Sequence, residues 1–357
     1  MNASLTYLPI RPDWLATRTE EILDPALPII DSHHHLYDRP GLRYLFEDYL
    51  QDIRSGHNVR ASVFVQARSM LRADAAPELE AVGETEFANG VAAMSASGLY
   101  GDARVCAGIV GFVDLLALGD RARTVLERHI VAAGGGADEG GRFCGIRQTL
   151  SWDTDARLLN PAYPTTEHMS ASSAFRAGFA HLAPLGLSFE AWAFFHQLPA
   201  VAELARAFPE TRIVLNHCGG VVRIAEYADR RDEVFERWKI GILELAACPN
   251  VSVKLSGLGM RMGGFGFEQH GSAPGSTEIA EAWRPWMETC VEAFGTRRCM
   301  YGSNFPVDKG SFSYATGLNA LKRVVSGASA DEKRDIFWRS AAAFYRLPEN
   351  GFSISGS

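Results

Sequence analysis

Short apolar runs alternate with segments of helical periodicity along most of the chain. The runs are short enough to be buried strands, and the segments between most of them repeat their apolar positions every three or four residues. The apolar runs are Leu27–His35, Val59–Ala67, Ala103–Asp114, Phe143–Leu150, Gly186–Trp192, Thr211–Gly219, Asn250–Leu258 and Arg298–Val307. The helical patterns cover Glu78–Ser97, Leu198–Phe208, Glu226–Ala247, Glu278–Phe294, Tyr314–Val325 and Asp331–Leu347. Strands that alternate with helices indicate a parallel α/β sheet, and eight such runs predict a distorted (β/α)8 TIM barrel rather than a doubly wound sheet.

Two long connections interrupt this alternation. The segment Leu36–Asn58 follows the first run, and Tyr44–Leu50 within it has the pattern of a short amphipathic helix. The segment Gly259–Ser276 is rich in glycine and has no period, which predicts either a lid over a binding site or a disordered loop. We expect one domain over residues 1–357, in which residues 1–26 are an extension that precedes the barrel.

Composition narrows the classes of partner and the compartment. The chain is 47% hydrophobic and 22% charged, and its net charge of −7 argues against nucleic acid or an anionic membrane as the main partner. A small molecule is the expected ligand, and a homo-oligomer stays open. The six cysteines form no CxxC pair, no apolar run is long enough to span a bilayer, and no signal peptide is visible. We therefore expect a cytoplasmic protein.

The first apolar run ends in a cluster of imidazoles. It begins with Ile29 and Ile30 and ends in Asp31–His35, whose last three residues are histidines. Side chains on a strand alternate between faces, so we expect His33 and His35 to share one face with Asp31 while His34 points away. Two imidazoles on one face can bind a metal ion, an oxyanion or a water molecule. The alternative is a polar turn that contains histidine by chance.

Other apolar runs also end in polar side chains. These residues are Gln66, Arg68, Arg147, Gln148, Glu190, His196, Asn216, His217, Lys254, Ser256, Ser303, Asn304 and Asp308. In a barrel the carboxyl ends of the strands meet on one face, which is where active sites lie. Because burying unpaired polar groups is costly, this many polar strand ends predict a shared pocket that contains solvent.

Three of these segments resemble the amidohydrolase superfamily. They are Asp31–His35 on the first strand, Asn216 with His217 on the sixth, and Tyr301–Val307 on the eighth. The chain is most similar to the amidohydrolase-2 group, which includes lactonases for pyrone dicarboxylate, fuconolactone, rhamnonolactone and sulfomuconolactone. The resemblance implies hydrolysis of a lactone or similar ester-like carbonyl compound by activated water, with or without a divalent metal.

The resemblance also assigns candidate metal ligands. It makes His33, His35 and His217 the expected ligands, and three histidines suit a catalytic zinc that keeps one position open for water. Operation without a metal is an equal alternative. In that case the same imidazoles would hydrogen-bond the oxyanion.

The eighth strand departs from the family pattern. Asn304 occupies the position where the family normally has an aspartate that binds metal or acts as general base. An amide cannot accept a proton at neutral pH and is a weak metal ligand. The base must then come from elsewhere, and Asp308, His196 and His217 are the candidates, with a histidine preferred because imidazole titrates near neutrality.

Three further strand-end residues are candidates for substrate binding. Arg147 is expected to hold an acidic group of the substrate in a bidentate grip, although a structural ion pair would explain it equally well. Gln66 and Lys254 are further candidates, with hydrogen bonds inside the barrel as the alternative. The sequence thus predicts a lactonase-like hydrolase of an acidic small molecule. Its rivals are a metal-dependent decarboxylase and a barrel that binds a ligand without catalysis, which Asn304 favours.

Overall fold

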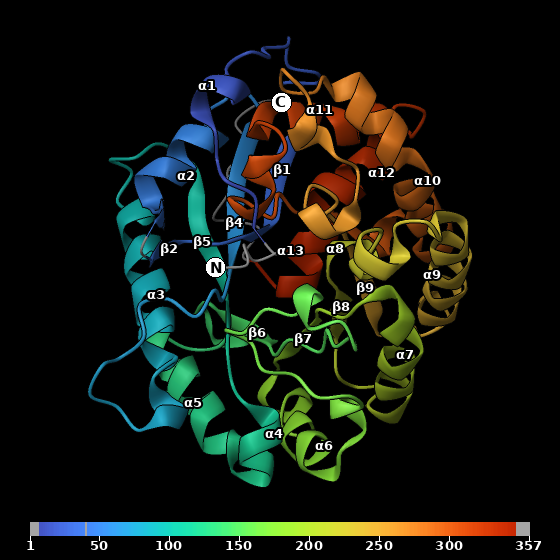
Figure 1. Ribbon diagram of the computed structural model, residues 1–357. Coiled ribbons are helices and arrows are strands. Elements are labelled where there is room, and N and C mark those ends of the chain that lie inside the picture. The colour runs from blue at the N-terminus through green and yellow to red at the C-terminus, as the bar shows by residue number, and fades with distance from the viewer. Residues whose placement is uncertain (1–6, 40, 348–357) are drawn as a thin grey trace.

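The computed structural model describes residues 7–39 and 41–347, and they form a barrel surrounded by helices (Figure 1). Eight parallel strands make one sheet in the order β1-β4-β5-β6-β7-β8-β9-β10. Their bounds are β1 (Pro28–His34), β4 (Asn58–Val65), β5 (Arg104–Gly111), β6 (Phe143–Arg147), β7 (Ser188–Ala191), β8 (Ile213–Leu215), β9 (Val251–Leu255) and β10 (Cys299–Tyr301). The predicted (β/α)8 barrel is confirmed.

The barrel closes through the residues that follow β10. The backbone N–H of Asn304 donates to the His33 carbonyl, and the N–H of His35 donates to the Phe305 carbonyl, both at 2.8 Å. His34 and Phe305 form a parallel bridge, although β1 and β10 are not paired along their whole length. Closure therefore brings the histidines of the first strand next to Asn304.

Helices cover the outside of the sheet, as a (β/α)8 barrel requires (Figure 1). The main ones are α3 (Val82–Ala96), α5 (Ala122–Ala132), α6 (Ser173–Phe179), α7 (Leu198–Ala207), α9 (Arg231–Ala246), α10 (Ser276–Phe294) and α11 (Tyr314–Val324). The shorter ones are α1 (Pro12–Leu15), α4 (Leu115–Leu118) and α8 (His217–Gly220). The sequence pattern did not predict α5, which buries Ala122, Val125, Leu126 and His129 at helical spacing, because its last buried position is a histidine. It also did not predict α6, which spans only seven residues.

The predicted final helix is divided into three parts. It consists of α12 (Ala330–Arg334), a π-helical turn (Asp335–Arg339) and α13 (Ser340–Tyr345). Side chains of α13 pack against apolar side chains from β1, β4, β5, β6, β8 and β10. The helix α13 is therefore part of the core of the barrel.

The described residues of the two long connections contain regular structure. The first contains a hairpin, β2 (Tyr37–Arg39) and β3 (Leu42–Tyr44), followed by α2 (Phe46–Ile53), which begins two residues later than the expected helix. The second, residues 259–276, contains two 3-10 turns and buries Met260, Met262 and Phe267, so the alternative of disorder is wrong. None of the described helices is long and apolar enough to cross a membrane. All six cysteines are buried free thiols.

Candidate active site

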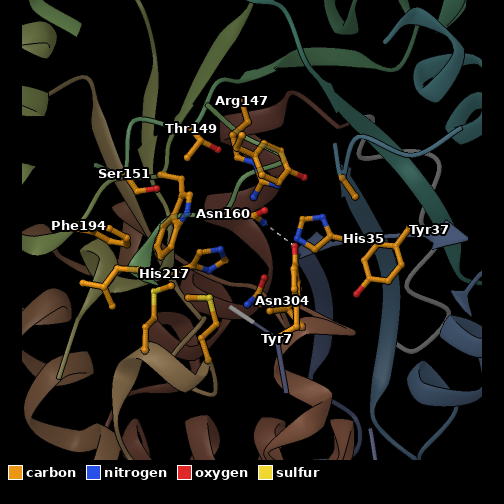
Figure 2. Close-up of a pocket in the computed structure, with 17 residues that line it drawn as sticks. Tyr7, His35, Tyr37, Arg147, Thr149, Ser151, Asn160, Phe194, His217 and Asn304 are labelled. Carbon is orange, nitrogen blue, oxygen red and sulfur yellow. Dashed lines mark hydrogen bonds between the residues drawn. The ribbon is translucent and has the colours of Figure 1, made fainter. Parts of the chain in front are cut away.

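A cavity opens where the strands end, and four of the predicted site residues line it: His35, Arg147, His217 and Asn304 (Figure 2). They come from the ends of β1, β6 and β8 and from the segment after β10, which are far apart in sequence. A concave site with a few convergent polar groups is typical of small-molecule binding.

His33 and His35 point to the same side of β1. Their Nε2 atoms lie 3.3 Å apart, whereas His34 points away, where its Nε2 lies 2.9 Å from the Ser62 hydroxyl and its ring stacks on Tyr49. This alternation confirms the expected arrangement of the three histidines. His35 Nδ1 lies 2.7 Å from the Val65 carbonyl. Because a carbonyl only accepts, this contact places the proton of His35 on Nδ1 and leaves its Nε2 as an acceptor.

Asp31 does not share the face of His33 and His35, and that expectation is wrong. Its carboxylate instead accepts from the hydroxyls of Tyr49 and Tyr314 and from the backbone N–H of Ser303. The pairing of β1 with β4 shifts register between Asp31 and His34. An extra residue at such a bulge reverses the alternation of faces, which periodicity alone does not predict.

A buried ion pair lies beneath the histidines. Lys254 Nζ is 2.7 Å from both carboxylate oxygens of Glu190 and 3.1 Å from His33 Nδ1. Glu190 also accepts from the Tyr345 hydroxyl of α13 and from the Asn216 amide. Burial lowers the pKa of Lys254 to about 8, against the opposing effect of Glu190. A protonated Lys254 donates to His33 Nδ1, so the His33 proton lies on Nε2 and points toward His35.

Arg147 lines the cavity, and its Nε–H has no partner among the described residues. Its Nη2 donates to the Gln66 carbonyl at 2.6 Å, and its Nη1 lies 3.3 Å from His33 Nε2. The Nε–H of this buried guanidinium has no hydrogen-bond partner among the described residues. An unpaired buried donor is costly, and this N–H has almost no surface accessible to solvent, so a ligand oxygen would reach it only after a shift of the side chain.

His217 adopts a left-handed backbone conformation, with φ at +56°. Its Nδ1 lies 3.0 Å from the Ser256 hydroxyl, and its ring meets the Trp192 ring edge-on at 4.9 Å between centroids. Gly257 passes so close that a Cβ there would lie 2.4 Å from the His217 side chain, which only glycine avoids. Burial, followed by the charges of Arg147 and Lys254, holds the pKa of His217 well below its usual range. The ring is therefore neutral at pH 7.

Asn304 is oriented by Asp308. The Asn304 amide donates to Asp308 Oδ1 at 2.8 Å, and its oxygen points toward the middle of the cavity (Figure 2). Asp308 is buried outside the cavity and also accepts from the backbone N–H of Gly259. Burial raises the pKa of Asp308 to about 7. Asp308 thus acts on the site through Asn304, and Asn304 offers an acceptor rather than a base.

Comparison with known proteins places this geometry in a family. Residues 30–347 match the family model of an amidohydrolase, Amidohydro_2. This chain belongs to the amidohydrolase family. An L-fucono-1,5-lactonase of Burkholderia multivorans is 29% identical over 90% of this chain and 96% of its own length, and an uncharacterized protein of Sinorhizobium fredii, y4mH, is 32% identical over 90% and 99%.

Solved structures of similar proteins agree with the assignment of this chain to the amidohydrolase family. Crystal structures of an amidohydrolase from Burkholderia multivorans, one with bound HEPES and one with bound zinc, superpose with a TM-score of 0.67 at 25% identity and cover 90% of this chain and 99% of theirs. A putative 2-pyrone-4,6-dicarboxylic acid hydrolase of Pseudomonas putida gives a TM-score of 0.61 at 16% identity, over 90% and 98%, which shows the shared fold.

Besides His33 and Asp308, three predicted site residues lie outside the cavity of this amidohydrolase. His196 lines a separate cavity, where its Nε2 lies 3.0 Å from Asp153, whose carboxylate also accepts from the Tyr227 hydroxyl. Lys254 is fully buried under His33, and the Gln66 side chain contacts the Arg147 backbone rather than the cavity. A side chain just past a strand end can turn to either side of the next loop, which the sequence does not determine.

Several cavity residues had not been singled out from the sequence. They are Tyr7, Tyr37, Ala67, Thr149, Ser151, Leu158, Asn160, Tyr163, Met260, Met262 and Val307. Thr149 and Ser151 follow Arg147 at intervals of two residues, so extending the alternation of β6 would have found them. Met260 and Met262 show that residues 259–276 form part of the wall, while the role of this loop as a lid stays a prediction.

The three histidines do not fit a resident divalent cation in this arrangement. The spacing of the Nε2 atoms of His33 and His35 resembles that of two ligands on tetrahedral zinc, about 3.3 Å. However, Arg147 Nη1 lies within 3.3 Å of His33 Nε2, and Lys254 approaches the opposite nitrogen of the same ring. No group of three or more histidine, cysteine, aspartate or glutamate side chains within residues 7–39 and 41–347 is arranged to hold a metal ion. The positive charges of Arg147 and Lys254 next to His33 would therefore repel a metal ion bound there.

Replacing Asn304 with aspartate is expected to raise zinc affinity about tenfold or more. The new carboxylate would supply an anionic ligand beside His35 and His217 and would offset the charges of Arg147 and Lys254. Zinc content after dialysis and competition with a chromogenic chelator measure the change. Asn160→Asp, which adds the same charge to the cavity wall, is the matched control. Equal affinity in Asn304→Asp and the wild type would contradict the prediction.

Proposed function

We propose that this amidohydrolase hydrolyses lactones. The observation that carries the proposal is that a neutral His217 and Arg147 line one cavity, and that the Nε–H of Arg147 has no partner among the described residues. Ester hydrolysis needs a group that takes a proton from water and a donor for the oxyanion, and these two residues supply them. Two relatives named L-fucono-1,5-lactonase support the same reaction type and, at a finer level, a lactone derived from a sugar.

In the proposed mechanism His217 activates the water molecule. With its Nδ1–H donated to Ser256, Nε2 takes a proton from water, whose oxygen attacks the lactone carbonyl carbon, while the Asn304 oxygen accepts the other water hydrogen. Arg147 Nε–H donates to the oxyanion that forms. The bond between the acyl carbon and the ring oxygen then breaks, and the proton on His217 passes to that oxygen, which gives the open hydroxy acid.

The low pKa of His217 keeps the ring unprotonated, although it weakens the ring as a base, and it favours the second half of this cycle. Burial and the neighbouring cations keep the ring unprotonated across the neutral range, so its lone pair is available to water. Once it is protonated, the same surroundings make the ring a strong acid, which favours transfer of the proton to the departing ring oxygen. A developing oxyanion near Arg147 supplies negative charge that stabilises the imidazolium between these two steps.

We propose that no resident divalent cation takes part in this chain, although a related amidohydrolase has been crystallised with zinc. Arg147 and Lys254 already supply the positive charge near His33. A metal-dependent decarboxylase, the rival reaction, needs a firmly held metal and is disfavoured for the same reason. An acidic group on the substrate stays a prediction, because the role proposed for Arg147 is to donate to the oxyanion.

A panel of lactones tests the proposed function. It includes aldono-1,5-lactones, aldono-1,4-lactones, a lactone that bears a carboxylate, and simple aliphatic lactones, with acid release followed by a pH indicator. We expect at least one sugar lactone to be hydrolysed with kcat/KM of about 10⁴ M⁻¹s⁻¹ or more, before and after dialysis against a chelator. Wild-type protein that hydrolyses none of the panel would contradict lactonase activity, and activity lost on chelation and restored by zinc would contradict metal-free operation.

A further inference from the structure

Residues 7–20, here called the N-terminal arm, lie along the loop of residues 259–276. Arg11 Nη2 donates to the Glu268 carbonyl at 2.6 Å, and Trp14 Nε1 donates to the His270 carbonyl at 2.9 Å. Further along, the Thr17 hydroxyl accepts from the Ala273 N–H, and a Glu20 carboxylate oxygen accepts from the Ser276 N–H. Each of these bonds uses the backbone of the loop. The position of the arm is therefore tied to the course of the loop.

Apolar packing reinforces these hydrogen bonds. Trp14, Leu15 and Ala273 form a small buried cluster, against which Ile10 packs. The guanidinium of Arg11 lies over the Trp14 ring at 4.2 Å, which adds a cation–π contact on the same side. Because Met260 and Met262 of this loop line the cavity, the arm and the loop together build one part of its wall.

Tyr7, at the beginning of the described arm, lines the cavity and meets the opposite wall. The Asn160 amide donates to the Tyr7 hydroxyl at 3.3 Å (Figure 2). Burial, and to a smaller extent the neighbouring Tyr7, raises the pKa of both Tyr37 and Tyr163. These phenols therefore stay protonated, and each can donate or accept a hydrogen bond. Three phenols and an amide make this side of the cavity a hydrogen-bonding surface.

The remaining wall has the opposite character. Trp192, Phe194, Met260 and Met262 line the cavity with aromatic and thioether groups. A ring that carries hydroxyl groups has both an apolar face of C–H bonds and polar edges, so one apolar wall and one hydrogen-bonding wall suit it. A simple aliphatic lactone has no ring hydroxyl groups that could bind to the hydrogen-bonding wall.

We propose that Tyr7 is a specificity-determining residue, positioned by the N-terminal arm, whose hydroxyl binds a ring hydroxyl of the substrate away from the reacting carbonyl. The proposal rests on the proposed lactone hydrolysis and adds to it the part of the chain that selects hydroxylated lactones. Tyr7 takes no part in the chemical step, since His217, Arg147 and Asn304 carry that step. The consequence is selective: Tyr7 affects binding of hydroxylated substrates and leaves the turnover of plain lactones unchanged.

Tyr7→Phe tests the proposal, because it removes one hydroxyl and keeps the ring. We expect KM for an aldono-1,5-lactone to rise about five- to tenfold, with kcat changed less than twofold and with both constants unchanged for an unsubstituted 1,5-lactone. Trp14→Phe, which removes the hydrogen bond to the His270 carbonyl and part of the packing of the N-terminal arm, should raise the same KM by a smaller factor. Tyr100→Phe, outside the cavity, is the matched control.

The outcomes separate this proposal from the proposed function. An equal rise in KM for hydroxylated and plain lactones, or no rise for either, would overturn the role of Tyr7. If the wild type hydrolyses no lactone, calorimetric titration with the open-chain aldonate replaces kinetics. Affinity that falls five- to tenfold in Tyr7→Phe would then support the binding role while the hydrolase assignment fails, and unchanged affinity would overturn both.

Discussion

Replacing His217 with alanine is expected to lower kcat/KM for the best lactone by about 10³-fold. The neutral His217 ring is the proposed base, because Asn304 is an amide, Asp308 is buried behind it, and the Nε2 of His35 lies against His33. Steady-state kinetics on the purified variant measures the effect. Full turnover in His217→Ala would rule out its assigned role as the base.

His196→Ala is the informative comparison for this experiment. The sequence made His196 an equal candidate for the base, whereas the structure pairs it with Asp153 beside a different cavity. We expect kcat/KM of His196→Ala within about twofold of the wild type. Thermal unfolding of both variants shows whether a loss of activity is caused by a loss of stability of the folded protein. A large loss in His196→Ala alone, at unchanged stability, would reverse the assignment of the base.

Replacing Arg147 with glutamine is expected to lower kcat by about 10²- to 10³-fold. The substitution removes the unpartnered Nε–H that is proposed to donate to the oxyanion, and such donors typically contribute this much. Arg147→Lys should not restore activity, since a point charge cannot reproduce the planar fork that reaches the Gln66 carbonyl and the cavity together. Single-turnover rates separate this effect from substrate binding.

Arg147→Gln should also shift the acidic limb of the profile of activity against pH to a higher pH. Burial is the main cause of the low pKa of His217, and the charge of Arg147 is the largest of the charge effects that follow it. Removing a neighbouring positive charge makes protonation easier, so the pKa of His217 rises in Arg147→Gln. Activity that requires the neutral ring is then lost at a higher pH than in the wild type. Arg157→Gln, an exposed arginine paired with Asp155, is the control, and a limb that does not move would argue against this coupling.

The sequence alone determined the architecture and the main chemical groups of this protein. Eight apolar runs separated by helical patterns are local signals, because the period of a strand or helix is set by neighbouring residues. The same local reading found that His33 and His35 share a face, and the resemblance to the amidohydrolases showed that Asn304 stands where an acid is usual. The local reading also found His217 and Arg147, because each directly ends or follows a buried strand, and parallel strands bring such positions to one end of a barrel.

Only the tertiary structure decided how these groups act. A bulge in β1 turned Asp31 to the side of Tyr49, and contacts between residues more than 200 positions apart placed Lys254 against the Ser32 carbonyl and His33. The Tyr7 side chain reached the cavity because its arm is bound to a loop some 250 residues later, for example by Arg11 and Glu268. Such contacts depend on the course of two distant segments in space. The periodicity of apolar residues along the chain does not encode such contacts. The sequence therefore identified the reacting groups, whereas tertiary packing determined their hydrogen-bond partners and protonation states.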